Sequence, residues 1–213
     1  MTALRMKLKF NGRIWEGMFS GDLFFSMPPI ETERLVLRRL EMADAQDIFD
    51  YGRDPEVARH VLWEPYRSVS ESRSYIRNMQ RRYRLGEASS WGIELKETGR
   101  VVGTIGYMWY QEEHSSVEVG YSLARPHWNK GLMTEALRAV IAHSFETLHV
   151  NRVEAQHELT NPASGEVMKK CGMRFEGTLR QRLRNKGRYV DVALYAILRE
   201  DYAACESRFR APR

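Results

Sequence analysis

The chain has 213 residues, of which 43% are hydrophobic and 29% charged, so it suits one folded domain with extensions and is too apolar for a disordered chain. No stretch approaches the roughly 20 apolar residues that span a membrane, and no secretory signal is recognisable. Two cysteines are too few for a disulfide scaffold. These features together favour a cytoplasmic protein. The formal net charge of +5 suits an anionic ligand or a nucleic-acid-rich partner.

The first thirty residues differ in pattern from the rest of the chain. Apolar residues alternate with lysines over 6–10, Asn11-Gly12 follows, and the alternation resumes at Ile14 and Trp15. Because both residues of such a turn need a positive φ, Asn-Gly between two alternating runs predicts a β-hairpin, here over residues 5–19. We assign residues 1–29 as a hairpin extension that serves packing or contact with another subunit, and so allow for a homo-oligomer.

Hydrophobic periodicity predicts a mixed α/β domain over residues 30–205, followed by a tail at 206–213. The predicted strands lie at 34–39, 89–96, 100–110, 116–124, 152–159, 173–184 and 188–198. The predicted helices run from a cap at Asp44 to about Tyr51, from Asp54-Pro55 onward, and over 70–85, 131–148 and 162–171. No internal repeat or low-complexity tract interrupts this order.

The entrance of the helix at 131–148 has the features of an anion site. A strand leads through a short loop into the helix, whose first N–H groups and positive dipole end attract a negative charge. Gly131 has no Cβ to keep a phosphate away from these amides, while Lys130 can add a charge and Thr134 a hydroxyl. A single glycine before a helix is more often a plain turn, so this segment alone does not decide the function.

A second helix entrance follows the strand at 152–159. Asn161 stands where a cap is expected, Pro162 takes the first helical position, and Gly172 ends the helix. Ser164 lies in the first turn and brings a hydroxyl to the end of the strand. In the predicted strand at 116–124, the side chain of Glu118 faces opposite to those of Val117 and Val119. If that face lines a cleft, Glu118 is a candidate general base.

These segments together resemble the GNAT superfamily of N-acetyltransferases, and more narrowly its branch of ribosomal-protein N-terminal (serine/alanine) acetyltransferases. The resemblance covers about residues 30–200 and is carried by three stretches in the matching order. They read IETERLVLRRL, EVGYSLARPHWNKGLMTEAL and NPASGEVMKKCGMRFEG, and LWEP at 62–65 adds weaker support.

The resemblance implies a mixed, mostly antiparallel central sheet, flanked by helices and splayed open between the strands at 116–124 and 152–159. Acetyl-CoA, the co-substrate, would lie in that gap. Its diphosphate would contact the amides of Asn129, Lys130, Gly131, Leu132 and Met133, with Thr134 helping. The backbone of Tyr121, Ser122 and Leu123 would hold the pantetheine arm, Asn161 would bond to it, and Ser164 would approach the sulfur as the second catalytic residue beside Glu118.

The loop departs from the usual family pattern at two positions. Pro126 stands where glutamine or arginine is common, and Asn129 stands at the first glycine. Asparagine tolerates a positive φ better than most residues, so we expect the turn to survive. Side-chain binding at position 126 is what this departure puts in doubt. No metal is expected, because the six histidines show no ligand spacing.

The acceptor stays open at this point. The resemblance favours a protein N-terminal α-amine attacking the thioester directly, with a polyamine, an amino acid or an antibiotic as the small-amine alternative. A third possibility is a non-catalytic module that binds RNA or the ribosome, which Arg81, Arg82 and Arg84 and the alternating Arg180, Arg182 and Arg184 suggest. We expect neither DNA nor a membrane as a partner.

Overall fold

The computed structural model describes residues 6–10, 13–17, 24 and 27–205, and its elements follow the predicted order. The α-helices are α2 Ala45–Gly52, α3 Pro55–Ala58, α4 Val69–Leu85, α5 Leu132–Glu146, α6 Pro162–Lys170 and α7 Arg199–Cys205, with 3-10 turns η1 Met42–Asp44 and η2 Arg125–His127. The strands of the large sheet are β3 Ile30–Glu31, β4 Leu35–Arg38, β5 Ser90–Leu95, β6 Arg100–Gln111, β7 Ser116–Leu123, β8 Arg152–Glu158, β9 Arg174–Asn185 and β10 Arg188–Leu198.

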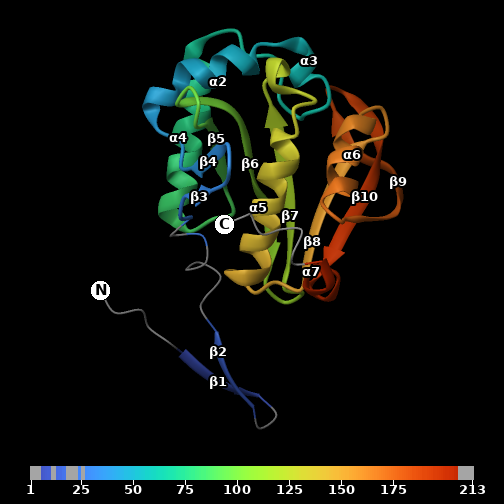
Figure 1. The fold of residues 1–213 in the computed structure, drawn as a ribbon. Coiled ribbons are helices and arrows are strands. Elements are labelled where there is room, and N and C mark those ends of the chain that lie inside the picture. The colour runs from blue at the N-terminus through green and yellow to red at the C-terminus, as the bar shows by residue number, and fades with distance from the viewer. Residues whose placement is uncertain (1–5, 11–12, 18–23, 25–26, 206–213) are drawn as a thin grey trace.

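The eight strands form one sheet in the order β3-β4-β5-β6-β7-β8-β10-β9 (Figure 1). Every neighbouring pair is antiparallel except β7 and β8, which run parallel. This pair is joined only from Ser116↔Arg152 to Glu118↔Glu154, although β7 continues to Leu123 and β8 to Glu158. The two strands therefore part beyond Glu118, which confirms the predicted sheet that splays open in its middle.

Helices cover both faces of this sheet. Successive residues of β6 point to opposite faces and so contact helices on both sides. Tyr107 bonds to His143 and Ser144 of α5 on one face, while Thr104 lies beside Tyr51 of α2 on the other. Figure 1 shows α5 lying along the sheet near β7, and α6 standing beside β8 and β10. The parted strands thus open between α5 and α6 on one face and toward α2 and α4 on the other.

Local signals explain where several helices begin and end. The helix predicted to begin at Asp54-Pro55 is α3, and Asp54 caps it by accepting a hydrogen bond from the N–H of Glu56 at 2.9 Å. Gly172 has a φ of 78° just after α6, as the predicted helix stop requires. Asp44 does stand at the start of α2, but the prediction that it caps the helix is wrong. Its carboxylate instead pairs with Arg38 and accepts the N–H of Glu41.

The predicted N-terminal hairpin is described in part. Strands β1 Met6–Phe10 and β2 Arg13–Gly17 pair antiparallel with Met6 opposite Gly17, but the predicted Asn11-Gly12 turn lies outside the described residues. Farther along, Phe24 and Met27 are buried, and Phe24 packs edge-on against Tyr107 and Tyr110. The division of the chain at residues 29 and 205 stays a prediction. Within the described residues, none of the helices is long and apolar enough to cross a membrane.

Candidate active site

The parted strands β7 and β8 place one carboxylate where they separate. Glu118 is the last residue of β7 that pairs with β8, and it is only partly exposed. Its Oε2 accepts the indole N–H of Trp109 at 2.7 Å, and its Oε1 accepts the amide of Gln156 at 3.0 Å. Both partners are neutral donors, so they orient the carboxylate without compensating its charge. Such a carboxylate can receive a proton or a positively charged amine.

Sequence reasoning missed both residues that hold Glu118. Trp109 reaches it because β6 is irregular between Tyr107 and Trp109, where Met108 is an extra residue opposite β7. A bulge of this kind reverses the side-chain alternation, and no local sequence signal marks it. Gln156 could have been found, since it lies two residues beyond the register partner of Glu118 and therefore on the same face of β8.

Glu118 is not the only carboxylate at this point of the sheet. Glu154 lies directly opposite it in the register of β7 and β8. The two differ in their partners, because the Nε of Arg152 donates to Glu154 at 2.5 Å. Glu154 is thus ion-paired with Arg152, whereas no cation among the described residues pairs with Glu118. Glu118 is therefore the better candidate base of the two.

On the α5–α6 face, two hydroxyls meet across the gap. Ser164 of α6 donates its Oγ hydrogen to the phenol oxygen of Tyr121 at 2.9 Å, and the phenol donates to the carbonyl of Ser164 at 3.0 Å. Burial raises the pKa of Tyr121 well above its usual value, so the phenol stays protonated at neutral pH. The predicted Ser164 therefore does lie at the gap, but it is paired with a tyrosine side chain that we had considered only for its backbone.

The other predicted residues of β7 and α6 lie along the same opening. Ser122 has its hydroxyl 3.2 Å from that of Thr104 and so faces α2, while Leu123 is buried. Beyond Glu118, β7 pairs with no residue of β8. Its edge toward β8 is thus free for an added extended segment. Asn161 stands at the start of α6, but its predicted side-chain cap is absent from the structure, which leaves its amide available to a ligand.

The start of α5 brings together the six residues predicted to bind a diphosphate. Gly131 precedes the helix with a φ of 78° and no side chain caps the first turn, so the N–H groups there are unpaired. Asn129 has a φ of 59°, as the predicted turn requires. Leu132 and Met133 are buried and anchor the helix, and Asn129, Lys130 and Gly131 are exposed, with Thr134 half-buried.

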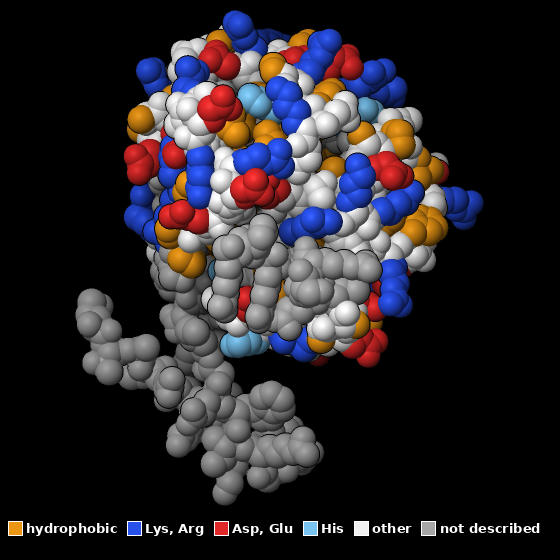
Figure 2. Space-filling view, viewed as in Figure 1, with side chains coloured by type: hydrophobic (Ala, Val, Ile, Leu, Met, Phe, Trp, Pro, Cys, Tyr) orange, Lys and Arg blue, Asp and Glu red, His pale blue; other side chains and the backbone are white. Residues whose placement is uncertain are grey.

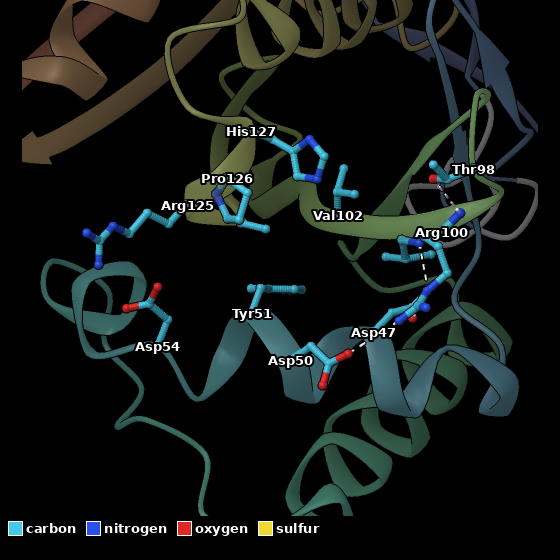
Figure 3. Close-up of a pocket in the computed structure, with 12 residues that line it drawn as sticks. Asp47, Asp50, Tyr51, Asp54, Thr98, Arg100, Val102, Arg125, Pro126 and His127 are labelled. Atoms are coloured by element: carbon cyan, nitrogen blue, oxygen red, sulfur yellow. Dashed lines mark hydrogen bonds and ion pairs between the residues drawn. The ribbon is translucent and has the colours of Figure 1, made fainter.

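A cavity of about 370 Å³ lies between α2 and η2 (Figure 3). Its acidic side chains are already engaged, since Asp47 and Asp50 both pair with Arg100 and Asp54 caps α3. Pro126, at which the sequence left side-chain binding in doubt, also lines this cavity. Among the described residues, no group of three or more histidine, cysteine, aspartate or glutamate side chains is arranged to hold a metal ion.

Positive charge gathers at the far edge of the sheet, where β9 has no outer neighbour. Arg180, Arg182 and Arg184 are exposed, and none pairs with an acidic side chain of the described chain. Basic, apolar and some acidic side chains share that side of the molecule in Figure 2.

Comparison with known proteins agrees with the geometry of the opening. A family model described as an acetyltransferase (GNAT) domain matches residues 34–174. The chain is 36% identical over 177 residues to an uncharacterized N-acetyltransferase, p20, of Bacillus licheniformis, a match covering 83% of this chain and 99% of p20. It is 29% identical to the [ribosomal protein uS5]-alanine N-acetyltransferase of Escherichia coli, over 81% of this chain and 92% of that protein. A solved GNAT-family acetyltransferase from Bacillus anthracis is 27% identical and superposes with a TM-score of 0.72 over 81% of this chain and 99% of its own.

Proposed function

Because the chain belongs to the GNAT family and is an N-acetyltransferase, we propose that it is a cytoplasmic enzyme that transfers the acetyl group of acetyl-CoA to the α-amine of a protein N-terminus. The neutral amine attacks the thioester carbonyl directly, the C–S bond breaks, and coenzyme A leaves as its thiol. Glu118, held at the opening by neutral donors, is the observation that carries this proposal.

The donor site is proposed from two features that converge on the opening. The uncapped start of α5 supplies unpaired N–H groups for the diphosphate, from Asn129 to Met133, with the hydroxyl of Thr134 nearby. The free edge of β7 over Tyr121, Ser122 and Leu123 can pair with the amides of the pantetheine arm, and the unbonded side chain of Asn161 can reach it from α6. Most of the rate would come from holding amine and thioester together and from amide donors to the developing oxyanion.

The energy of deprotonation favours an α-amine over a lysine as the acceptor. An α-amino group with a pKa near 8 costs about 1.4 kcal/mol to neutralise at pH 7, whereas a lysine near 10.4 costs about 4.6 kcal/mol. A single carboxylate can supply the smaller cost of deprotonating the α-amine more easily than the larger cost of deprotonating a lysine. The similarity to an enzyme that acetylates the alanine of ribosomal protein uS5 supports the same acceptor class. A small amine such as a polyamine is the second candidate, because the negative charge of Glu118 would also attract it.

Ser164→Ala should lower kcat while leaving the affinity for acetyl-CoA nearly intact. The hydroxyl of Ser164 hydrogen-bonds with Tyr121 and can pass a proton toward the departing sulfur. A thiol has a pKa near 8.5, so release as an unprotonated thiolate costs only about 2 kcal/mol at pH 7, which limits the loss to about 30-fold. Steady-state kinetics would measure it, with the exposed Ser74→Ala of α4 as the control. Unchanged turnover would remove Ser164 from the mechanism.

The proposed acceptor is tested by comparing protein N-termini in cells with and without this protein by mass spectrometry. A defined set of N-termini should lose acetylation when the protein is absent, and peptides with those sequences should be acetylated by the purified enzyme. The same enzyme should turn over spermidine poorly. Faster turnover of spermidine than of every N-terminal peptide would favour the small-amine alternative.

A further inference from the structure

An arginine more than ninety residues away in sequence holds the loop before α5. Arg34, between β3 and β4, donates from its NH1 to the carbonyl of Lys130 at 2.9 Å. Its Nε and NH2 both lie 2.7 Å from Oε2 of Glu135, and its backbone N–H donates to Oε1 of Glu135 at 2.8 Å. Arg34 thus connects the segment just before β4 with the loop and with the first turns of α5.

Glu135 is held from both sides. The hydroxyl of Thr32 donates to its Oε1 at 2.6 Å and itself accepts the N–H of Leu35 at 3.0 Å, so Thr32 is fixed by the start of β4. The side chain of Glu135 is only 16% exposed. Burial alone would raise the pKa of this carboxyl, but the bonds from Thr32 and Arg34 outweigh it and lower the pKa, so Glu135 is ionised at neutral pH.

The bond from Arg34 acts on a sharply turned stretch of backbone. Asn129 and Gly131 both have positive φ values, 59° and 78°, on either side of Lys130. The bond from Arg34 fixes the carbonyl of Lys130. A Cβ at Gly131 would lie 3.5 Å from NH2 of Arg34, so the guanidinium borders this stretch directly. Since Glu135 neutralises Arg34, the arginine acts chiefly by positioning the loop.

We propose that Thr32, Arg34 and Glu135 form a clamp that preorganises the loop 129–131 to bind the diphosphate of acetyl-CoA. This inference rests on the proposed function, because it assigns a positioning role at the same donor site. The clamp sets the affinity for the donor and leaves the chemical step alone. Without it, binding would have to order the loop, which weakens affinity by about 10- to 100-fold.

The first test compares two acetyl donors with Arg34→Ala. Acetyl-CoA carries the diphosphate, whereas acetyl-pantetheine keeps the thioester and lacks it. The variant should raise the KM for acetyl-CoA by about 10- to 100-fold, with kcat and the kcat/KM for acetyl-pantetheine nearly unchanged. Arg34→Lys should recover part of the loss, because lysine keeps the positive charge but lacks the rigid fork of donors with which the guanidinium holds both partners. Arg77→Ala, the loss of an exposed arginine on α4, is the control.

Glu135→Gln distinguishes a role of Glu135 in positioning the loop from a direct effect of its charge on diphosphate binding. Removing a negative charge close to a diphosphate would tighten binding if electrostatics alone mattered. The clamp requires the opposite, because glutamine loses the ion pair with Arg34 and releases the loop. Calorimetry with coenzyme A should therefore give weaker binding to this variant than to the wild type.

The outcomes separate the clamp from the proposed function. A wild type that binds no coenzyme A would overturn both. Wild-type binding with equal or tighter binding by Glu135→Gln would overturn the clamp alone, as would an equal loss of kcat/KM for both donors in Arg34→Ala. If circular dichroism shows that Arg34→Ala does not fold, Arg34→Lys and Glu135→Gln carry the test with the same readouts.

Discussion

Glutamine in place of Glu118 should lower kcat for an N-terminal peptide by about 10-fold at pH 7, because only about one-tenth of an α-amine with a pKa near 8 is neutral there and the variant has no base to deprotonate the rest. The substitution also disturbs the local geometry. Both oxygens of Glu118 accept hydrogen bonds, from Trp109 and from Gln156. A glutamine amide has only one acceptor oxygen, so its NH2 must face one of these donors or turn away. Steady-state kinetics with saturating acetyl-CoA would measure the loss.

The pH dependence of this loss tests the role of Glu118 more directly than its size. An α-amino group with a pKa near 8 is roughly 1% neutral at pH 6 and mostly neutral at pH 9. A base is needed only while the amine is protonated. The ratio of wild-type to variant rates should therefore be largest at low pH and shrink above pH 8. A ratio that stays constant from pH 6 to 9 would show that Glu118 does not act as the base.

Glu154→Gln is the matched control for this experiment. Glu154 occupies the register position opposite Glu118, so the same chemical change is made at almost the same place in the sheet. Its carboxylate is bound by Arg152, and that arginine also pairs with Glu176. We expect less than a threefold change in kcat. A loss as large as that of Glu118→Gln would mean that the total negative charge of the opening matters, and that no single carboxylate is the base.

The sequence predicts the elements of the domain well because its signals are local. Each long strand and helix follows from alternation or helical spacing, and Gly131 and Gly172 mark real turns with positive φ. The order of these elements also places two helix entrances beside the parted strands. The two-residue strand β3 and the last helix, α7, were not predicted, since neither has enough residues for a clear period.

The site is less predictable because its contacts join distant segments. Trp109 meets Glu118 only through the irregularity at Met108, and Tyr121 meets Ser164 across the gap between β7 and α6. Arg34, near the start of the domain, contacts Lys130 and Glu135, which come about a hundred residues later in the sequence. The sequence separation of these pairs does not predict that they are in contact. The sequence can supply the candidate residues, but only the fold decides which of them meet.

Alanine at Gly103 should destabilise the protein by about 3 kcal/mol, the upper end of the usual range for overpacking. Its Cβ would lie 2.3 Å from the carbonyl oxygen of Ser122 and 3.0 Å from Cα of Leu123. These are backbone atoms of β7, so no side chain can rotate away and the strand itself must move. Urea unfolding at 25 °C would measure the change in the free energy of unfolding.

Gly120→Ala is the matched control, because the same change on β7 meets only the flexible end of Met108, with Sδ at 2.8 Å. Met108 is 43% exposed and can turn aside, so the loss of stability should stay below about 1 kcal/mol. Gly103→Ala should also raise the KM for acetyl-CoA in the protein that stays folded, since it shifts Ser122 and Leu123, where the pantetheine arm is proposed to pair. Equal stability of the two variants would mean that the end of β7 moves freely, and a mobile edge could not hold the donor in place for attack.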